Sequence, residues 1–278
     1  MLASIVWNVS PQVFPFLEIP RWYGLLWCVG LILSYYVMSC LCKRNGQSIA
    51  TLDTLTLYVI TGTLVGARLG HVLFYNPEYY WQHPWEIILP VTFSPGFKFV
   101  GYEGLASHGA GIGILTAIFI YSKRYHQNYF RIADDIAIVA ALAGGCIRIG
   151  NLMNSEMIGL PTDVAWAFVF PLYDDIPRHP AQLYEAIFCF LLFAVLLKLR
   201  LSKNHLSPGF LTGIFLVALF TERFINEFFK ISQEAFEDQM TLNMGQLLSI
   251  PMIIVGGILL FQTIKKSGPT DKIGGKTA

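Results

Sequence analysis

Three arginines in apolar stretches are the residues of this chain best suited to chemistry. Arg148 follows the apolar run 136–143, and Arg68 and Arg223 lie near the ends of two other apolar stretches. A charge near the centre of a bilayer costs about 2.5–3.5 kcal/mol on insertion scales, so such residues usually face a bundle interior or a water-filled cavity. Because guanidinium binds phosphate through paired hydrogen bonds, converging arginines predict a site for an anionic head group.

The stretch 144–159, GGCIRIGNLMNSEMIG, adds further polar groups around Arg148. Asn151 comes three residues after Arg148, so both are expected on one face of a helix. Glu156 and Gly159 follow where the apolar segment ends. Several polar groups at the end of one apolar segment predict one wall of a site.

His108 and the pair of Arg223 and Glu227 are the other candidates. Histidine has an unperturbed pKa near neutrality, which makes His108 a candidate general base. Arg223 and Glu227 are four residues apart and therefore share a helix face. Plainer interpretations stay open here. His108 could anchor a span at the head groups, Arg68 could extend to the interface, and the Arg223–Glu227 pair could be a structural salt bridge.

The composition is that of an integral membrane protein. Of the 278 residues, 54% are hydrophobic and 13% are charged, whereas a soluble domain averages about 25% charged residues. A net charge of +1 does not favour a nucleic-acid partner. The five cysteines show no metal or disulfide spacing, and there is no HExxH motif. We therefore expect no metal and no cofactor.

Seven stretches are apolar enough to cross a membrane, which takes about 20 residues. They are 22–41, 53–75, 106–122, 133–153, 182–200, 208–229 and 244–264. The stretch 84–100 is apolar but contains three prolines, so we expect a re-entrant or interfacial segment there. The prediction is an all-α bundle of seven transmembrane helices in one domain, 1–265, followed by a polar cytoplasmic tail, 266–278.

Basic residues give the expected orientation. They cluster on alternate loops, and 12 of the 19 fall on one side, which the positive-inside rule makes cytoplasmic. The N-terminus is then outside and the C-terminus cytoplasmic. Polar groups of all seven predicted helices fall toward the outer side: Tyr23, Arg68, His108, Arg148, His179, Arg223 and Gln246. We expect them to line one cavity open toward the outer leaflet.

Ordered motifs between about residues 20 and 250 resemble the prolipoprotein diacylglyceryl transferase family. They are RWYG at 21–24, GARLG at 66–70, SHGAG at 107–111, RIGNLMNSEMIG at 148–159, RHPAQLYE at 178–185 and ERFINEFF at 222–229. The chain departs from the family pattern at three positions. Leu219 stands where the family has an aromatic hydroxyl, Ala110 where it has a glycine, and Asp135 where it has a proline.

The resemblance implies a multi-pass enzyme of the bacterial cytoplasmic (inner) membrane. Such enzymes move the sn-1,2-diacylglyceryl group of phosphatidylglycerol to the thiol of the lipobox cysteine of a prolipoprotein. The products are a thioether and glycerol phosphate, in the first step of lipoprotein maturation. The implied partners are phosphatidylglycerol, signal peptides with a lipobox cysteine, and membrane lipid, with no nucleic acid and no cofactor.

Residue roles are carried over to the matching positions. The catalytic set is His108, Arg148, Glu156 and Arg223, and the substrate-binding set is Tyr23, Arg68, Asn151, Gly159, His179 and Glu227. The arginines would bind phosphate and stabilise the leaving charge, and a base would help deprotonate the thiol. Which residue takes that proton stays open. The alternative is an anion or lipid transporter that uses Arg68, Arg148 and Arg223 as its binding site.

Overall fold

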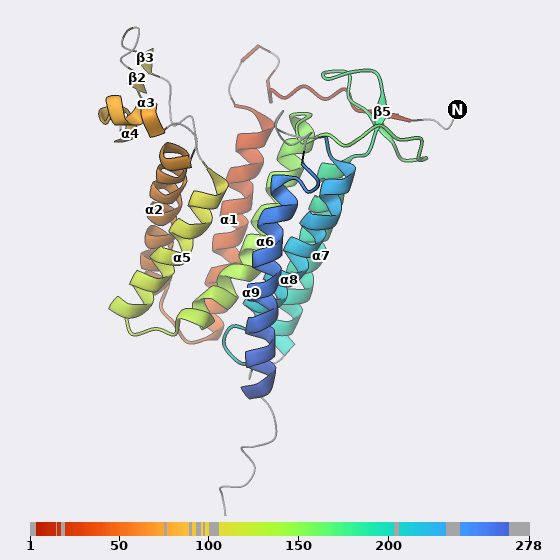
Figure 1. Cartoon of the computed structure of the whole chain (residues 1–278). Coiled ribbons are helices and arrows are strands. Elements are labelled where there is room, and N and C mark those ends of the chain that lie inside the picture. The colour runs from red at the N-terminus through yellow and green to blue at the C-terminus, as the bar shows by residue number, and fades with distance from the viewer. Residues whose placement is uncertain are drawn as a thin grey trace, which may run out of the picture. The chain divides into compact units, whose positions relative to one another are not determined.

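The computed structural model describes residues 4–14, 16–17, 20–74, 77–88, 91–92, 96, 98–99, 106–202, 206–231 and 240–266. Long helices dominate these residues (Figure 1). They are α1 (Trp22–Arg44), α2 (Ile49–Phe74), α5 (Ser107–Arg124), α6 (Tyr129–Met153), α7 (Ala181–Ser202), α8 (Phe210–Asn226) and α9 (Met244–Lys266). A helix therefore lies over each of the seven predicted ranges, and the helical fold class is confirmed.

Five of these helices are long and apolar enough to cross a membrane, namely α1, α2, α6, α7 and α9. They identify an integral membrane protein. Helices α5 and α8 have 18 and 17 residues and are not among the five. At 1.5 Å per residue, α8 is roughly 26 Å long, slightly less than a hydrocarbon core of about 30 Å. It continues directly into a turn of 3-10 helix, η1 (Glu227–Phe229).

A small sheet was not predicted from the sequence. It has the order β1 (Ile5–Val6), β4 (Phe168–Val169) and β5 (Pro177–Arg178), with β1 parallel and β5 antiparallel to β4. Its strands of two residues are too short to show an alternating pattern. Trp7 donates its indole N–H to the carbonyl oxygen of Leu152 at 3.0 Å, which ties the N-terminal segment to the end of α6.

The segment predicted to be re-entrant or interfacial is described in part. It holds α4 (Trp85–Ile88) and an antiparallel pair of strands, β2 (Val91–Thr92) and β3 (Lys98–Phe99), preceded by α3 (Pro77–Gln82). Most of the rest of 84–100 lies outside the described residues, as do 267–278 of the predicted tail. Whether this segment enters the membrane stays a prediction.

The chain forms two compact units. The smaller unit is Ser39–Ala133, and the larger unit combines Met1–Met38 with Asp134–Ala278. In the smaller unit α2 and α5 lie side by side, and in the larger unit α8 packs on α7 and α9 (Figure 1). Helices α1 and α6 each contribute residues to both units.

Glycines bring α2 and α5 into backbone contact. The contact is formed by Gly62, Gly66 and Gly70 of α2 and by Gly109 and Gly113 of α5. A Cβ atom added to Gly66 would overlap the carbonyl oxygen of Gly109 and lie 2.7 Å from Cα of Gly113. Small residues at four-residue spacing permit this approach, which is common where helices pack inside membranes.

Replacement of Gly113 by alanine is expected to separate these helices and lower the free energy of unfolding by about 1–3 kcal/mol, the usual cost of overpacking. A Cβ atom at Gly113 would overlap the carbonyl oxygen of Gly62. Gly111→Ala is the matched control on the same helix, since a Cβ atom there has no neighbour within 4 Å. Thermal unfolding in detergent compares the two variants. Equal midpoints would show that the α2–α5 contact does not limit stability.

Two aspartates join the start of α6 to other helices of the larger unit. Asp134 accepts hydrogen bonds from the backbone N–H groups of Gly209 and Thr212, each at 2.8 Å, at the point where α8 begins. The Thr212 hydroxyl donates a third bond to Asp134 at 2.8 Å. Asp135 forms a buried ion pair with Arg200 of α7, with 2.7 Å between Oδ1 and Nε. The neighbouring aspartates thus fix α8 and α7 against α6.

Candidate functional site

Five charged side chains of the larger unit form a continuous chain of ion pairs, which we call the charge ladder. Its members in order are Arg148, Glu185, Lys230, Glu227 and Arg223. Glu185 pairs directly with Arg148 on one side and with Lys230 on the other. Nζ of Lys230 lies 3.2 Å from Oε1 of Glu227, and Nε of Arg223 lies 4.0 Å from the same oxygen. Positive and negative charges therefore alternate along the ladder.

Four helical elements supply the ladder. Arg148 lies in the last turns of α6 and Glu185 near the start of α7. The other three come from one continuous segment, because Arg223 lies in the last turn of α8, Glu227 begins η1 and Lys230 follows η1. Intervals of four and three residues place these three on one face. Gly245 of α9 makes room for the carboxylate of Glu227, since a Cβ atom there would lie 2.7 Å from its carboxyl carbon.

Burial divides the ladder into a closed interior and two open ends. Glu185, Glu227 and Lys230 are buried, whereas the side chains of Arg148 and Arg223 are 19% and 34% exposed. Burying an unpaired charge is costly, so the alternation stabilises the interior. Within the described part of the chain, Nη2 of Arg148 and both Nη atoms of Arg223 have no hydrogen-bond partner. Each open end is thus a guanidinium group with N–H donors that can still form hydrogen bonds.

Asparagine amides complete the bonding of the ladder. Asn226 donates to Oε1 of Glu185 at 2.9 Å, and Asn243 donates to Oε2 of Glu227 at 3.1 Å. Nη1 of Arg148 donates to Oδ1 of Asn151 at 3.3 Å, so these two residues share one face of α6 as predicted. The amides fix both carboxylates and the end of α6 in position.

Glu156 is held just beyond the end of α6. Its carboxylate accepts hydrogen bonds from Asn151 at 3.1 Å and Asn154 at 3.0 Å. Ser155 and Met157, which flank it, have positive φ angles of 53° and 56°. Such angles are uncommon for residues other than glycine, and strained backbone of this kind clusters at functional sites. Asn151 thus links Glu156 to Arg148.

Gly159 lies where three backbone segments meet. Its N–H donates to the carbonyl oxygen of His179 at 3.1 Å, and the next N–H, of Leu160, donates to that of Phe229 at 2.7 Å. A Cβ atom at Gly159 would overlap the His179 carbonyl oxygen and lie 2.8 Å from that of Phe229. Close packing therefore explains the glycine.

His179 lies beside this junction. Its Nδ1 is 3.1 Å from the hydroxyl of Tyr184, and its ring contacts that of Phe229, with centroids 5.2 Å apart. Burial lowers the pKa of His179, so the imidazole is neutral at pH 7. A neutral imidazole keeps both hydrogen-bonding roles available.

Arg178 ties the preceding loop to Gly159. Its Nε donates to Oδ1 and Oδ2 of Asp174 at 3.0 and 3.1 Å, and its Nη1 donates to the carbonyl oxygen of Gly159 at 3.3 Å. The bond from Arg178 lowers the pKa of Asp174, which keeps this carboxylate ionised well below neutral pH. The pair stabilises the loop that carries β4 and β5.

Tyr23 lies beside α6 in the larger unit. A Cβ atom at Gly150 would be 3.1 Å from Cδ2 of Tyr23, so the tyrosine ring packs directly on this glycine. Gly150 comes two residues after Arg148 and one before Asn151. The start of α1 is thus held against the part of α6 that carries the ladder.

Arg68 and His108 belong to the smaller unit. Nε of Arg68 donates to the carbonyl oxygen of Ile87 at 3.0 Å, its Nη2 donates to that of Glu86, and its guanidinium lies 5.0 Å from the ring centroid of Tyr80. Arg68 therefore anchors α3 and α4 to α2. His108 is exposed and is the second residue of α5.

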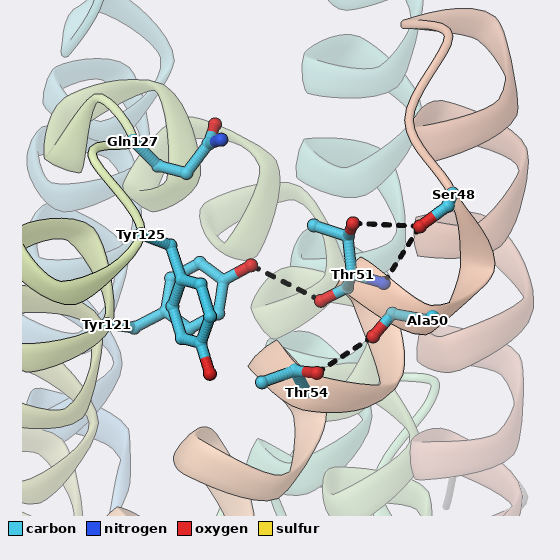
Figure 2. Close-up of a pocket in the computed structure, with 7 residues that line it drawn as sticks. All are labelled: Ser48, Ala50, Thr51, Thr54, Tyr121, Tyr125 and Gln127. Carbon is cyan, nitrogen blue, oxygen red and sulfur yellow. Dashed lines mark hydrogen bonds between the residues drawn. The ribbon is translucent and has the colours of Figure 1, made fainter.

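A hollow of about 310 Å³ also lies in the smaller unit, between the start of α2 and the end of α5 (Figure 2). It is lined by Ser48, Ala50, Thr51, Thr54, Tyr121, Tyr125 and Gln127. The Tyr121 hydroxyl reaches across it to the carbonyl oxygen of Thr51 at 3.3 Å (Figure 2). None of the predicted site residues lines this hollow.

Two residues of the ladder were missing from the predicted site. Glu185 belongs to the motif RHPAQLYE, but it carried no predicted role. Lys230 was overlooked, although it stands three residues after Glu227 and seven after Arg223. That helical spacing was the available signal. Lysines that follow an apolar segment usually extend to the interface, whereas this one is buried.

These features define an integral membrane protein with a buried chain of ion pairs among its helices. The sequence model of the prolipoprotein diacylglyceryl transferase family matches residues 11–262, and the chain belongs to this family. It is a transferase, as its motifs predicted.

Three relatives carry the name phosphatidylglycerol–prolipoprotein diacylglyceryl transferase. The one from Bacteroides fragilis is 47% identical over 270 residues, covering 96% of this chain and 98% of the relative. The one from Chloroherpeton thalassium is 42% identical over 268 residues, covering 95% and 96%. The one from Tolumonas auensis is 41% identical over 264 residues, covering 94% and 98%. Similarity therefore extends over almost the whole of each chain.

Proposed function

We propose that this enzyme transfers the sn-1,2-diacylglyceryl group of phosphatidylglycerol to the thiol of the lipobox cysteine of a prolipoprotein, in line with the names of its relatives. The cysteine sulfur forms a bond to the terminal glyceryl carbon, and the bond between that carbon and the phosphate oxygen breaks. Glycerol phosphate leaves with the electron pair, and the thiol proton passes to a base. The products are a thioether and glycerol phosphate.

The observation that carries this proposal is the pair of open guanidinium groups at the ends of the charge ladder. The phosphodiester of phosphatidylglycerol has one negative charge, and breaking its bond to the glyceryl carbon adds a second. Arg148 and Arg223 have Nη atoms without a hydrogen-bond partner among the described residues, and these can donate to phosphate oxygens. Donors aimed at the developing charge stabilise the transition state more than the substrate.

The thiol requires a base, because a free cysteine has a pKa of about 8.5. We assign this role to His108, because histidine is the side chain that most often serves as a general base in enzymes. Glu156, fixed by two amides beyond α6, is the second catalytic candidate. The residues assigned to substrate binding are Tyr23, Arg68, Asn151, Gly159, His179 and Glu227.

The membrane arrangement is also a proposal. All seven long helices cross the bacterial inner membrane, the N-terminus is outside, the C-terminus is cytoplasmic, and the site opens toward the outer leaflet. The basic ends of α1, α5, α7 and α9 support this orientation through the positive-inside rule. A fluorescent protein that folds only in the cytoplasm should fluoresce when fused to the C-terminus, and absence of fluorescence would reverse the assignment.

The function is tested with the purified protein in detergent micelles that contain phosphatidylglycerol and a lipobox peptide. Mass spectrometry should show a diacylglyceryl adduct on the peptide cysteine. We expect Arg148→Ala to abolish the adduct. Arg124→Ala is the matched control, because Arg124 is exposed in the last turn of α5 and belongs to no predicted site.

Two results would contradict the proposal. Folded wild-type protein that yields no adduct excludes the reaction. Movement of lipid or anion across liposomes without any covalent product would instead support the transporter.

A further inference from the structure

We propose that Lys230 is a positioning residue for this reaction. It holds the carboxylates of Glu185 and Glu227 from the buried side of the charge ladder, and so leaves the outer nitrogens of Arg148 and Arg223 open for the phosphate of the lipid. The inference rests on the proposed function.

The surroundings of Lys230 fix its ammonium group between two carboxylates. Its side chain is 2% exposed. Nζ contacts Oε1 of Glu185 and lies 3.2 Å from Oε1 of Glu227. The backbone is held as well, by a bridge to Gly159. Lys230 therefore has no path to solvent, and its charge acts on the two glutamates.

The arrangement of oxygen atoms explains why the arginines stay open. Oε1 of Glu185 is occupied by Lys230 and Asn226, so only Oε2 is left for Arg148. In Glu227, Oε1 lies beside Lys230 and Oε2 accepts from Asn243.

A bidentate pair with arginine requires both oxygens of one carboxylate. Neither glutamate has both oxygens free, and the shortest contact of Arg148 and of Arg223 with its glutamate is made by Nε. Nη2 of Arg148 and both Nη atoms of Arg223 are left for an external anion.

Removal of the Lys230 ammonium group would free carboxylate oxygens of Glu185 and Glu227 for bonds with the arginines. The ladder has three cations and two carboxylates, and without Lys230 the numbers are equal. Each glutamate would then have one arginine as its only cationic partner in the ladder. Attraction between opposite charges strengthens in a low-dielectric interior, so bidentate internal pairs would compete with the lipid phosphate. Glu156 and Glu222 lie outside the ladder and remain in the variant, and Glu222 also interacts electrostatically with Arg148, Arg223 and Lys230.

The test is the variant Lys230→Met, which keeps the length of the side chain and removes the charge. We expect KM for phosphatidylglycerol, and Kd for a short-chain phosphatidylglycerol, to rise about tenfold, because bonds to a charged donor are lost to internal competition. The kcat should change less than threefold. Lys230→Arg should restore the wild-type KM. Lys198→Met, on an exposed lysine of α7, is the matched control.

A double variant tests whether KM rises because Glu185 competes with the lipid phosphate for Arg148. Lys230→Met with Glu185→Gln removes one cation and one carboxylate, so Arg148 is open again and KM should return toward the wild-type value. If Lys230→Met alone does not fold, the double variant is compared with Glu185→Gln, and KM should be higher in the double variant because Glu227 has lost its lysine.

Unchanged KM and Kd in a folded variant that lacks Lys230 overturn the inference, whatever happens to kcat. Failure of the proposed function is distinct, since wild-type protein would then form no thioether. Even then, Kd for the short-chain phosphatidylglycerol would still show whether Lys230 affects binding of the lipid phosphate.

Discussion

Exchange of Arg223 for lysine is expected to lower kcat about 100- to 1,000-fold, the usual loss when one donor to a developing negative charge is removed. Lysine retains the positive charge but lacks the planar pair of N–H groups that matches two phosphate oxygens. The fold should be unaffected, because the only ion-pair partner of Arg223 among the described residues is Glu227 at 4.0 Å, and the side chain is 34% exposed.

Steady-state kinetics with phosphatidylglycerol and a lipobox peptide measure this loss, and thermal unfolding confirms that the variant is folded. Arg124→Lys serves as the control, since it makes the same exchange at an exposed position of the smaller unit. A kcat within threefold of wild type would show that charge alone is sufficient at this end of the charge ladder. The geometric role of Arg223 would then have to be abandoned.

The helices could be predicted from sequence because their signal is local. A continuous apolar stretch of about 20 residues is specific for a membrane-spanning helix, and each of the seven stretches is helical in the structure. The strands could not be predicted in this way. Strands β1 and β4 pair residues that are 163 apart, Ile5 with Phe168, and two residues carry no periodic pattern.

In the candidate site, too, local contacts could be predicted from the sequence and long-range contacts could not. The contact of Arg148 with Asn151, and the proximity of Arg223 to Glu227, follow from helical spacing and are present in the structure. The bonds of Glu185 to Arg148 and Lys230 join three different segments, and nothing in the local sequence specifies them. Long-range pairing of buried charges is decided by the tertiary packing of the helices.

Replacement of Asp134 by alanine is expected to lower the free energy of unfolding by about 3–5 kcal/mol, through several buried donors that each cost about 1–3 kcal/mol when unsatisfied. Asp134 is fully buried and accepts the backbone N–H groups of Gly209 and Thr212 as well as the Thr212 hydroxyl. The negative charge also lies at the N-terminus of α8, where it interacts favourably with the helix dipole. No side chain of α8 caps its own start.

Asp134→Asn should lose less stability than Asp134→Ala, because the amide oxygen can still accept from Thr212 while the amide nitrogen faces the N–H of Gly209. Asp163→Ala, at an exposed position of the loop before β4, is the matched control and should change stability by less than about 0.5 kcal/mol. Unfolding in mixed detergent micelles measures all three. Since α8 ends at the segment that carries Arg223 and Glu227, loss of its anchor should also reduce lipidation in proportion to the unfolded fraction. Equal stability of Asp134→Ala and Asp163→Ala would mean that helix packing alone positions α8, and that the aspartate of α6 is dispensable for the charge ladder.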